Sequence, residues 1–252
     1  LESTNLDYSV ITPIYKNLYL KELKKKNIKG IFLERFPNYN FIKDLNNYFE
    51  KIYIKSFKPD IIHDTYYSKN LYKDLKIKKV ITVHDLIYEN FSKYYSHKID
   101  EKLKEKKLAI EKSDFIICVS NTTKNNLLDL YNIDEKKIKV IYHGADHLDN
   151  IKPLDFNIKF DKEFLLYIGE RSKYKKFNFL LEAFSKLGKI KNNLNLVCFG
   201  GGQFSKHEHE IIKSFRLEKN VKLFSNYDDS TLKHLYTNAK FLVLPSETEG
   251  FG

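Results

Sequence analysis

Short apolar runs alternate with stretches of helical periodicity along the chain, and this alternation limits the folds that the sequence can adopt. Strands are predicted at 8–12, 29–33, 59–63, 78–85, 114–120, 137–144, 163–169, 194–202, 221–225 and 241–244. Helices are predicted between them at 14–27, 40–57, 92–112, 121–131, 176–188, 205–215 and 230–239. Strands that alternate with helices form βαβ units and mostly parallel sheets. The predicted fold class is therefore α/β.

Several predicted helices are preceded by residues that can cap a first turn. Ser120 and either Asp228 or Asp229 offer side-chain oxygens to the otherwise unpaired N–H groups there. Ser205 and Glu208 have the spacing of a capping box. These residues support the predicted starts of the helices at 121–131, 205–215 and 230–239.

The alternation stops between residues 145 and 162, which are polar, contain Pro153 and have no clear periodicity. We interpret residues 151–162 as a linker. The chain is thus predicted to consist of an N-terminal domain at 1–150 and a second domain at 163–252.

The composition is that of a globular protein, with 252 residues of which 42% are hydrophobic. No apolar run approaches the roughly 20 residues that a membrane-spanning helix needs. The first residues lack the pattern of a signal peptide, and Cys118 and Cys198 lie in apolar strands, which predicts buried, reduced thiols in a cytoplasmic protein. Because methionine is absent throughout, we expect the sequence to be incomplete at both ends.

The net charge of +11 fits a genome rich in A and T, which would have no functional meaning, or an anionic partner. That partner would be nucleic acid, a membrane surface or a phosphorylated small molecule. The basic residues are spread over many predicted helices, without an Arg-rich tract or interleaved aromatic residues. This pattern argues against nucleic acid as a partner.

The final predicted strand leads into a segment with the composition of a ligand-binding loop. The apolar run FLVL at 241–244 is followed by PSETEGFG at 245–252. In open α/β sheets, ligands bind beyond the carboxyl ends of strands, and glycine lets the backbone approach them closely. An ordinary strand-to-loop junction would have the same composition, so this motif alone leaves both interpretations open.

A basic loop, GERSKYKK at 169–176, follows the first strand of the second half. Arg171 and Lys175 would project from the carboxyl end of that strand. A guanidinium and an ammonium group together suit a diphosphate. The alternative is a solvated basic loop without a ligand.

These segments, in this order, resemble the retaining glycosyltransferases of family 4 (group 1). Three segments are similar to the family's donor-binding half: YIGERSKYKKFNFLLEAF, NLVCFGGGQF and NVKLFSNYDDSTLKHLYTNAKFLVLPSETEGFG. Four segments are similar to the family's acceptor domain: IIHDTYYS, VITVHDLIYENF, DFIICVSNTTKNNL and KVIYHGADH. The resemblance covers about residues 59–252 and is nearest to bacterial mannosyltransferases that build lipopolysaccharide or capsular glycans.

The resemblance implies a GT-B architecture, in which two Rossmann-like domains with parallel sheets face a cleft. The first domain would bind the acceptor and the second the nucleotide sugar. The second glutamate of the family's paired motif would lie beyond Gly252, so we expect the second domain to be truncated.

The resemblance also implies roles for individual residues. Arg171 and Lys175 would hold the diphosphate, Glu249 would contact the donor sugar, and His84 would reach toward the reacting sugar. The further donor-binding positions, which line the sugar, the phosphate or the base, are Asn226, Tyr227, Gly250, Phe251 and Gly252. One position departs from the family, which often has asparagine where this chain has Lys176.

The implied function is retaining transfer of a hexose to a glycan or lipid-linked acceptor in cell-surface polysaccharide synthesis. Mannose from GDP-mannose is the candidate donor. The reaction would need no cofactor and no metal, because cationic side chains can stabilise the leaving diphosphate and no Asp-x-Asp motif ends a strand. The basic charge would favour peripheral contact with the inner face of the plasma membrane. The alternative is a non-catalytic nucleotide-sugar or glycan-binding protein of the same fold.

Other candidate sites are weaker. His207 and His209 diverge on a helix, and Gly144 favours a loop rather than a helix that would bring His143 and His147 together. Glu247 and Glu249 are conceivable as hydrolytic carboxylates, but two residues apart on one loop they are poorly placed to flank a glycosidic bond.

Overall fold

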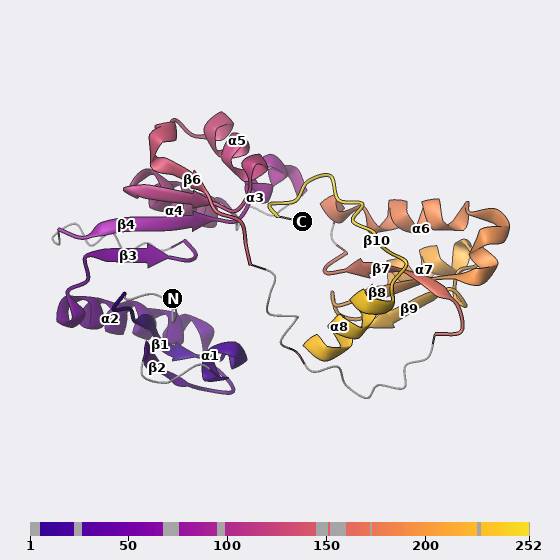
Figure 1. Ribbon diagram of the computed structural model, residues 1–252, viewed down its shortest axis with the longest axis horizontal. Helices are drawn as coiled ribbons and strands as arrows, with labels where there is room; N and C mark the ends of the chain where they lie inside the picture. The colour runs from indigo at the N-terminus through magenta and orange to yellow at the C-terminus, as the bar shows by residue number, and fades with distance from the viewer. Residues whose placement is uncertain are drawn as a thin grey trace. The chain divides into compact units, whose positions relative to one another are not determined.

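The computed structural model describes residues 6–22, 27–67, 76–94, 99–144, 151, 160–171, 173–225 and 228–251. Strands and helices alternate along the chain, and the strands form parallel pairs, which confirms the predicted α/β class (Figure 1). The predicted linker falls mostly outside the described residues, and the predicted division into domains stays a prediction.

The first sheet is a parallel pair. Its strands are β1 (Val10–Tyr15) and β2 (Ile28–Phe32), and the helices that follow them are α1 (Leu18–Glu22) and α2 (Tyr39–Phe57). The strand register shifts around Pro13, since proline has no N–H to donate to the ladder. A side chain at Gly30 would place its Cβ 1.9 Å from the Thr12 carbonyl oxygen, so only glycine fits there. The Asn46 side chain bonds the N–H and the C=O of Ile14 at 2.7 and 2.9 Å, which holds α2 to the sheet.

The second sheet has the order β3-β4-β5-β6. Its strands are β3 (Ile61–Asp64), β4 (Lys78–Val83), β5 (Phe115–Cys118) and β6 (Ile138–Val140). The β3–β4 and β5–β6 pairs are parallel. The carboxyl end of β4 delivers His84 to one edge of this sheet.

The segment after β4 differs from the prediction of one helix over 92–112. A short helix α3 (Ile87–Asn90) and a 3₁₀ turn (Ser92–Tyr94) come first, and α4 spans Ile99–Glu111. Burial of Leu86 and Ile87 anchors α3 directly after the strand. Asp100 and Glu101 lie in the first turn of α4, where they complement the helix dipole.

The third sheet has the order β10-β7-β8-β9, and all its pairs are parallel. Its strands are β7 (Glu163–Ile168), β8 (Leu194–Phe199), β9 (Val221–Phe224) and β10 (Phe241–Leu242), and its helices are α6 (Phe177–Ser185), α7 (Lys206–Ser214) and α8 (Asp229–Asn238). Tyr167 of β7 packs into one core with Phe177 and Ile212 of α6 and α7, whereas Leu166 packs with Leu235 of α8. Successive side chains of a strand point to opposite faces, so helices cover both faces of this sheet (Figure 1).

The local signals at the helix starts are confirmed. α5 (Asn121–Leu130) is capped by Ser120, α8 by Asp228, and α7 by a complete capping box of Ser205 and Glu208. Both cysteines are free and buried, and burial raises the pKa of each thiol to about 12, so both remain protonated at neutral pH.

We expect Leu181→Ala to reduce the free energy of unfolding by about 2–5 kcal/mol, because Leu181 is 0% exposed and its truncation leaves a cavity. Phe179→Ala on the same helix is the matched control, since Phe179 is 63% exposed and its loss should change stability little. Urea denaturation measures the free energy of unfolding of both variants. Equal losses would show that α6 does not bury the face described here.

Candidate functional site

The third sheet contains a topological switch point. The chain proceeds from β7 to β8 and β9 on one side and returns to place β10 on the other side of β7. In doubly wound sheets the ligand crevice lies outside the carboxyl ends of the strands at such a point. Here the switch point lies between the loop after β7 and the loop after β10, the two loops that the sequence predicts to bind the donor.

Lys175 and Glu249 join these two loops. The Lys175 Nζ donates to both carboxylate oxygens of Glu249, at 2.6 and 2.7 Å. Both side chains are partly buried, 19% and 25% exposed, so solvent screens the pair less than it would on an open surface. The structure thus brings together two of the predicted site residues, one cation and one carboxylate.

A second ion pair runs beside the first. Lys176 pairs with Glu247, and the Glu247 N–H donates to the Tyr174 carbonyl oxygen at 3.0 Å. The hydrogen bond with Glu247 raises the pKa of Lys176, and burial raises the pKa of Tyr174 to about 12. Lys175 and Lys176 therefore pair with Glu249 and Glu247, and these two ion pairs hold the loop after β7 against the loop after β10.

The backbone at Lys176 gives a physical reason for the asparagine that the family often has at this position. Lys176 is the N-cap of α6 and has φ 52° and ψ 34°, the left-handed conformation. Asparagine adopts this conformation more readily than lysine does. An asparagine at this position would relieve backbone strain, whereas lysine accepts the strain and forms the ion pair with Glu247.

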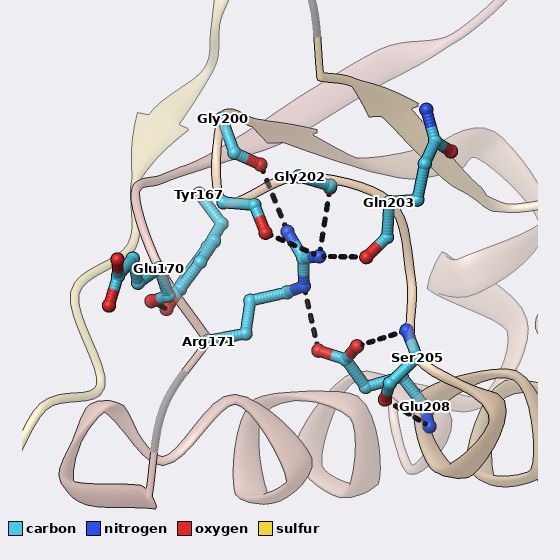
Figure 2. Close-up of polar contacts among 9 residues, drawn as sticks. Tyr167, Glu170, Arg171, Gly200, Gly202, Gln203, Ser205 and Glu208 are labelled. Carbon is cyan, nitrogen blue, oxygen red and sulfur yellow. Dashed lines mark hydrogen bonds and ion pairs between the residues drawn. The ribbon is translucent and has the colours of Figure 1, made fainter. Parts of the chain in front are cut away.

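Arg171 holds a glycine-rich loop in place (Figure 2). Its Nε donates to Glu208 at 2.7 Å, and its Nη atoms donate to four successive backbone carbonyls at 3.0–3.2 Å, those of Gly200, Gly201, Gly202 and Gln203. The guanidinium also lies 4.8 Å from the ring centroid of Phe204. The Arg171 side chain is only 4% exposed. Its hydrogen bonds are directed at the protein, and its predicted contact with a diphosphate stays a prediction.

The glycines make this arrangement possible. Gly200, Gly201 and Gly202 have φ values of 78°, 69° and 71°, which L residues rarely adopt. A Cβ at Gly201 would lie 2.7 Å from Nη1 of Arg171. The successive left-handed residues turn their carbonyl oxygens toward one guanidinium, as Figure 2 shows.

Glu208 and Tyr167 complete the surroundings of Arg171. Burial raises the pKa of Glu208, but hydrogen bonds from Ser205 and Arg171 outweigh it and hold this pKa below its usual range. The Tyr167 hydroxyl donates to the Glu170 carbonyl oxygen at 2.6 Å, and burial raises its pKa. Glu208 is therefore ionised at neutral pH and balances the charge of Arg171.

His84 lies directly after β4, and its ring stacks on His143 with centroids 5.6 Å apart. The hydroxyl of Thr123 in α5 lies 3.3 Å from the His84 carbonyl oxygen. The sequence does not single out this pair, although His84 and His143 each follow a strand of the second sheet. Gly250 and Phe251 continue the loop after Glu249, whereas Asn226, Tyr227 and Gly252 lie outside the described residues.

Two other kinds of site are absent from the described part of the chain. It contains no group of three or more histidine, cysteine, aspartate or glutamate side chains arranged to hold a metal ion. Among the described helices, none is both long and apolar enough to span a bilayer.

Both halves of the chain match family models. Residues 1–147 match the model described as Glycosyltransferase Family 4, and residues 151–252 match the model described as Glycosyl transferases group 1. The O-antigen chain mannosyltransferase RfbU of Salmonella typhimurium is 29% identical over 178 residues, which are 69% of this chain and 47% of RfbU. The chain spans about half the length of this relative. These matches confirm the resemblance seen in the sequence.

Solved structures show the same fold. Sucrose-phosphate synthase from Thermosynechococcus elongatus superposes with a TM-score of 0.68 at 20% identity, over 90% of this chain and 62% of that one. HepE from Anabaena, solved with UDP and glucose, superposes with a TM-score of 0.60 at 16% identity, over 89% of this chain and 62% of that one. This likeness confirms the predicted GT-B fold class.

We expect Arg171→Ala to reduce the free energy of unfolding by about 3 kcal/mol or more, because it leaves the Glu208 carboxylate and the loop carbonyls without their partner. Arg35→Ala is the control, since Arg35 is exposed, lies outside the residues with positive φ, and its removal changes the net charge equally. Urea denaturation at pH 7 measures both. If Arg171→Ala keeps its stability and loses only nucleotide binding, Arg171 is a diphosphate ligand rather than the clamp of the glycine loop.

We expect Lys176→Asn to raise Tm by about 2–4 °C, because relief of the left-handed strain outweighs the loss of an exposed ion pair. Lys189→Asn is the control, because Lys189 is exposed and lies outside the residues with positive φ. Thermal denaturation followed by circular dichroism measures both variants. A lower Tm for Lys176→Asn would mean that the Glu247 pair contributes more than the strain costs.

Proposed function

Because the chain belongs to Glycosyltransferase Family 4, we propose that it transfers a hexose from a nucleotide sugar to a glycan or lipid-linked acceptor. The observation that carries the proposal is the position of Lys175 and Glu249 at the switch point of the third sheet. A cation and a carboxylate side by side can bind the two ends of the bond that such a reaction breaks. The cation suits the diphosphate, and the carboxylate suits the hydroxyl groups of the sugar.

The chemistry that we propose follows from these charges. The bond between the anomeric carbon and the diphosphate oxygen breaks, and the acceptor oxygen forms the new bond to that carbon. Negative charge develops on the leaving diphosphate, where the Lys175 ammonium would stabilise it. For transfer with retention, the acceptor attacks from the face that the diphosphate leaves, and the acceptor proton passes to a diphosphate oxygen. The side chains supply the charge that a divalent metal would otherwise provide.

For the donor, we propose a nucleoside diphosphate hexose, with GDP-mannose as the first candidate. RfbU, by its name, transfers mannose into O-antigen chains, and HepE was solved with UDP and glucose. We further propose that the chain acts in cell-surface polysaccharide synthesis at the inner face of the plasma membrane. Its net charge of +11 would attract it to anionic lipids that surround a lipid-linked acceptor.

Binding of nucleotide sugars tests this proposal. The protein is heated with GDP-mannose, UDP-glucose, other nucleotide sugars and the free nucleotides, each with and without a chelator. We expect one nucleotide family to raise Tm, with or without chelator. Lys175→Ala should weaken binding about tenfold to a hundredfold, because it removes a charge-assisted contact. Lys189→Ala, which removes an exposed lysine from the same half, is the control.

Transfer of labelled sugar to a lipid-linked acceptor separates the remaining outcomes. Glu249→Gln should reduce kcat. Binding without transfer would favour a non-catalytic nucleotide-sugar or glycan-binding protein. If no nucleotide sugar raises Tm, the donor site proposed here does not exist.

A further inference from the structure

A buried ion pair holds the turn that carries His84. Lys106 of α4 is 3% exposed, and its Nζ lies 2.9 Å from each carboxylate oxygen of Glu89 in α3. The Tyr131 hydroxyl donates to Glu89 Oε1 at 2.9 Å. The same Lys106 Nζ donates to the backbone carbonyl of Asp85 at 2.7 Å. One buried ammonium therefore ties α4 both to α3 and to the residue that follows His84.

Stability alone is a poor reason for such a pair. Lysine and glutamate are almost never buried unless they are paired, and apolar residues of similar volume often stabilise a protein equally well. Apolar replacements could fill the same space. They could not donate a hydrogen bond to the Asp85 carbonyl, so this contact distinguishes the ion pair from a hydrophobic core.

The turn at Asp85 decides where the His84 side chain lies. β4 ends at Val83, and α3 begins at Ile87, so His84 and Asp85 lie within a short connection. Asp85 Oδ1 accepts a hydrogen bond from the Ile87 N–H at 3.1 Å, which fixes the end of the turn toward α3. Lys106, which belongs to α4, holds the same turn through its hydrogen bond to the Asp85 carbonyl oxygen. The His84 ring, which this connection carries, stacks on His143.

We infer that Lys106, with Glu89 as its counter-ion, is a positioning residue for His84. It acts through the Asp85 carbonyl and touches no substrate. The catalytic part of this inference rests on the proposed function, in which His84 reaches the reacting sugar. The structural part, that Lys106 determines the place of the His84 ring, is independent of any activity.

NMR of the histidine rings tests the structural part. The His84 signal is assigned through its absence in His84→Gln, and the exposed His207 serves as an internal reference. We expect Lys106→Met to shift or broaden the His84 ring signal and leave His207 unchanged. Lys102→Met, one turn earlier on α4 and exposed, should change neither. An unchanged His84 signal in Lys106→Met would overturn the inference, whatever the activity.

A double variant separates positioning from stability. Lys106→Met alone leaves the Glu89 charge buried and should be destabilised, whereas Lys106→Met with Glu89→Met removes both charges and should recover stability. We expect the double variant to fold and still to show the displaced His84 signal. If the double variant recovers the native His84 signal, the pair serves stability only, and the inference fails.

Kinetics of the double variant test the catalytic part. We expect kcat to fall about tenfold to a hundredfold with the donor KM unchanged, because a misplaced catalytic group slows the reaction without weakening donor binding. A displaced His84 signal with an unchanged kcat would leave Lys106 as a positioning residue but refute the role of His84. Absence of any transfer by the native protein would refute the proposed function, and the NMR result would still decide on Lys106.

Discussion

The parallel hydrogen bonding of β7 with β8 on one side and β10 on the other is the constraint on which the candidate donor site depends. Parallel strands in one sheet all end at the same edge. The loops after β7 and β10 therefore meet, although Lys175 and Glu249 are 74 positions apart in the sequence. The core on both faces of β7 fixes that strand, and the strand fixes the loop that follows it. Lys175 and Glu249 therefore pair because β10 lies next to β7 in the sheet.

The basic loop after β7 separates two cations that look equivalent in the sequence. Arg171 is directed at the protein, where its planar fork suits a row of backbone carbonyls and the Glu208 carboxylate. Lys175 is directed at the loop after β10. A flexible ammonium exchanges one anionic partner for another more easily than a guanidinium held by several acceptors. This difference is the physical basis for assigning the diphosphate to Lys175 in the proposed reaction.

Much of the fold could be predicted because its signals are local. The caps at Ser120, Ser205 and Asp228 depend on residues within one helical turn, and all of them are found. The predicted start of the helix at 92–112 was wrong, because a 3₁₀ turn occupies Ser92–Tyr94 and α4 begins at Ile99. The charged residues there continue a helical pattern, but the burial of Leu86 and Ile87 places a separate short helix before α4. Periodicity reports which residues can be helical, whereas packing decides where a helix begins.

The sequence by itself determined the α/β class, the alternation of strands and helices, the basic loop at 169–176 and the acidic loop at 245–252. These follow from periodicity and from composition over short windows. Only the tertiary structure decided which charges meet. Four lysines of α4 cannot be told apart from the sequence pattern: Lys102, Lys104, Lys106 and Lys107. Of these only Lys106 is buried. The reason is that an ion pair depends on the distance between residues far apart in the chain. That distance exists only once the strands have paired and the helices have packed against them.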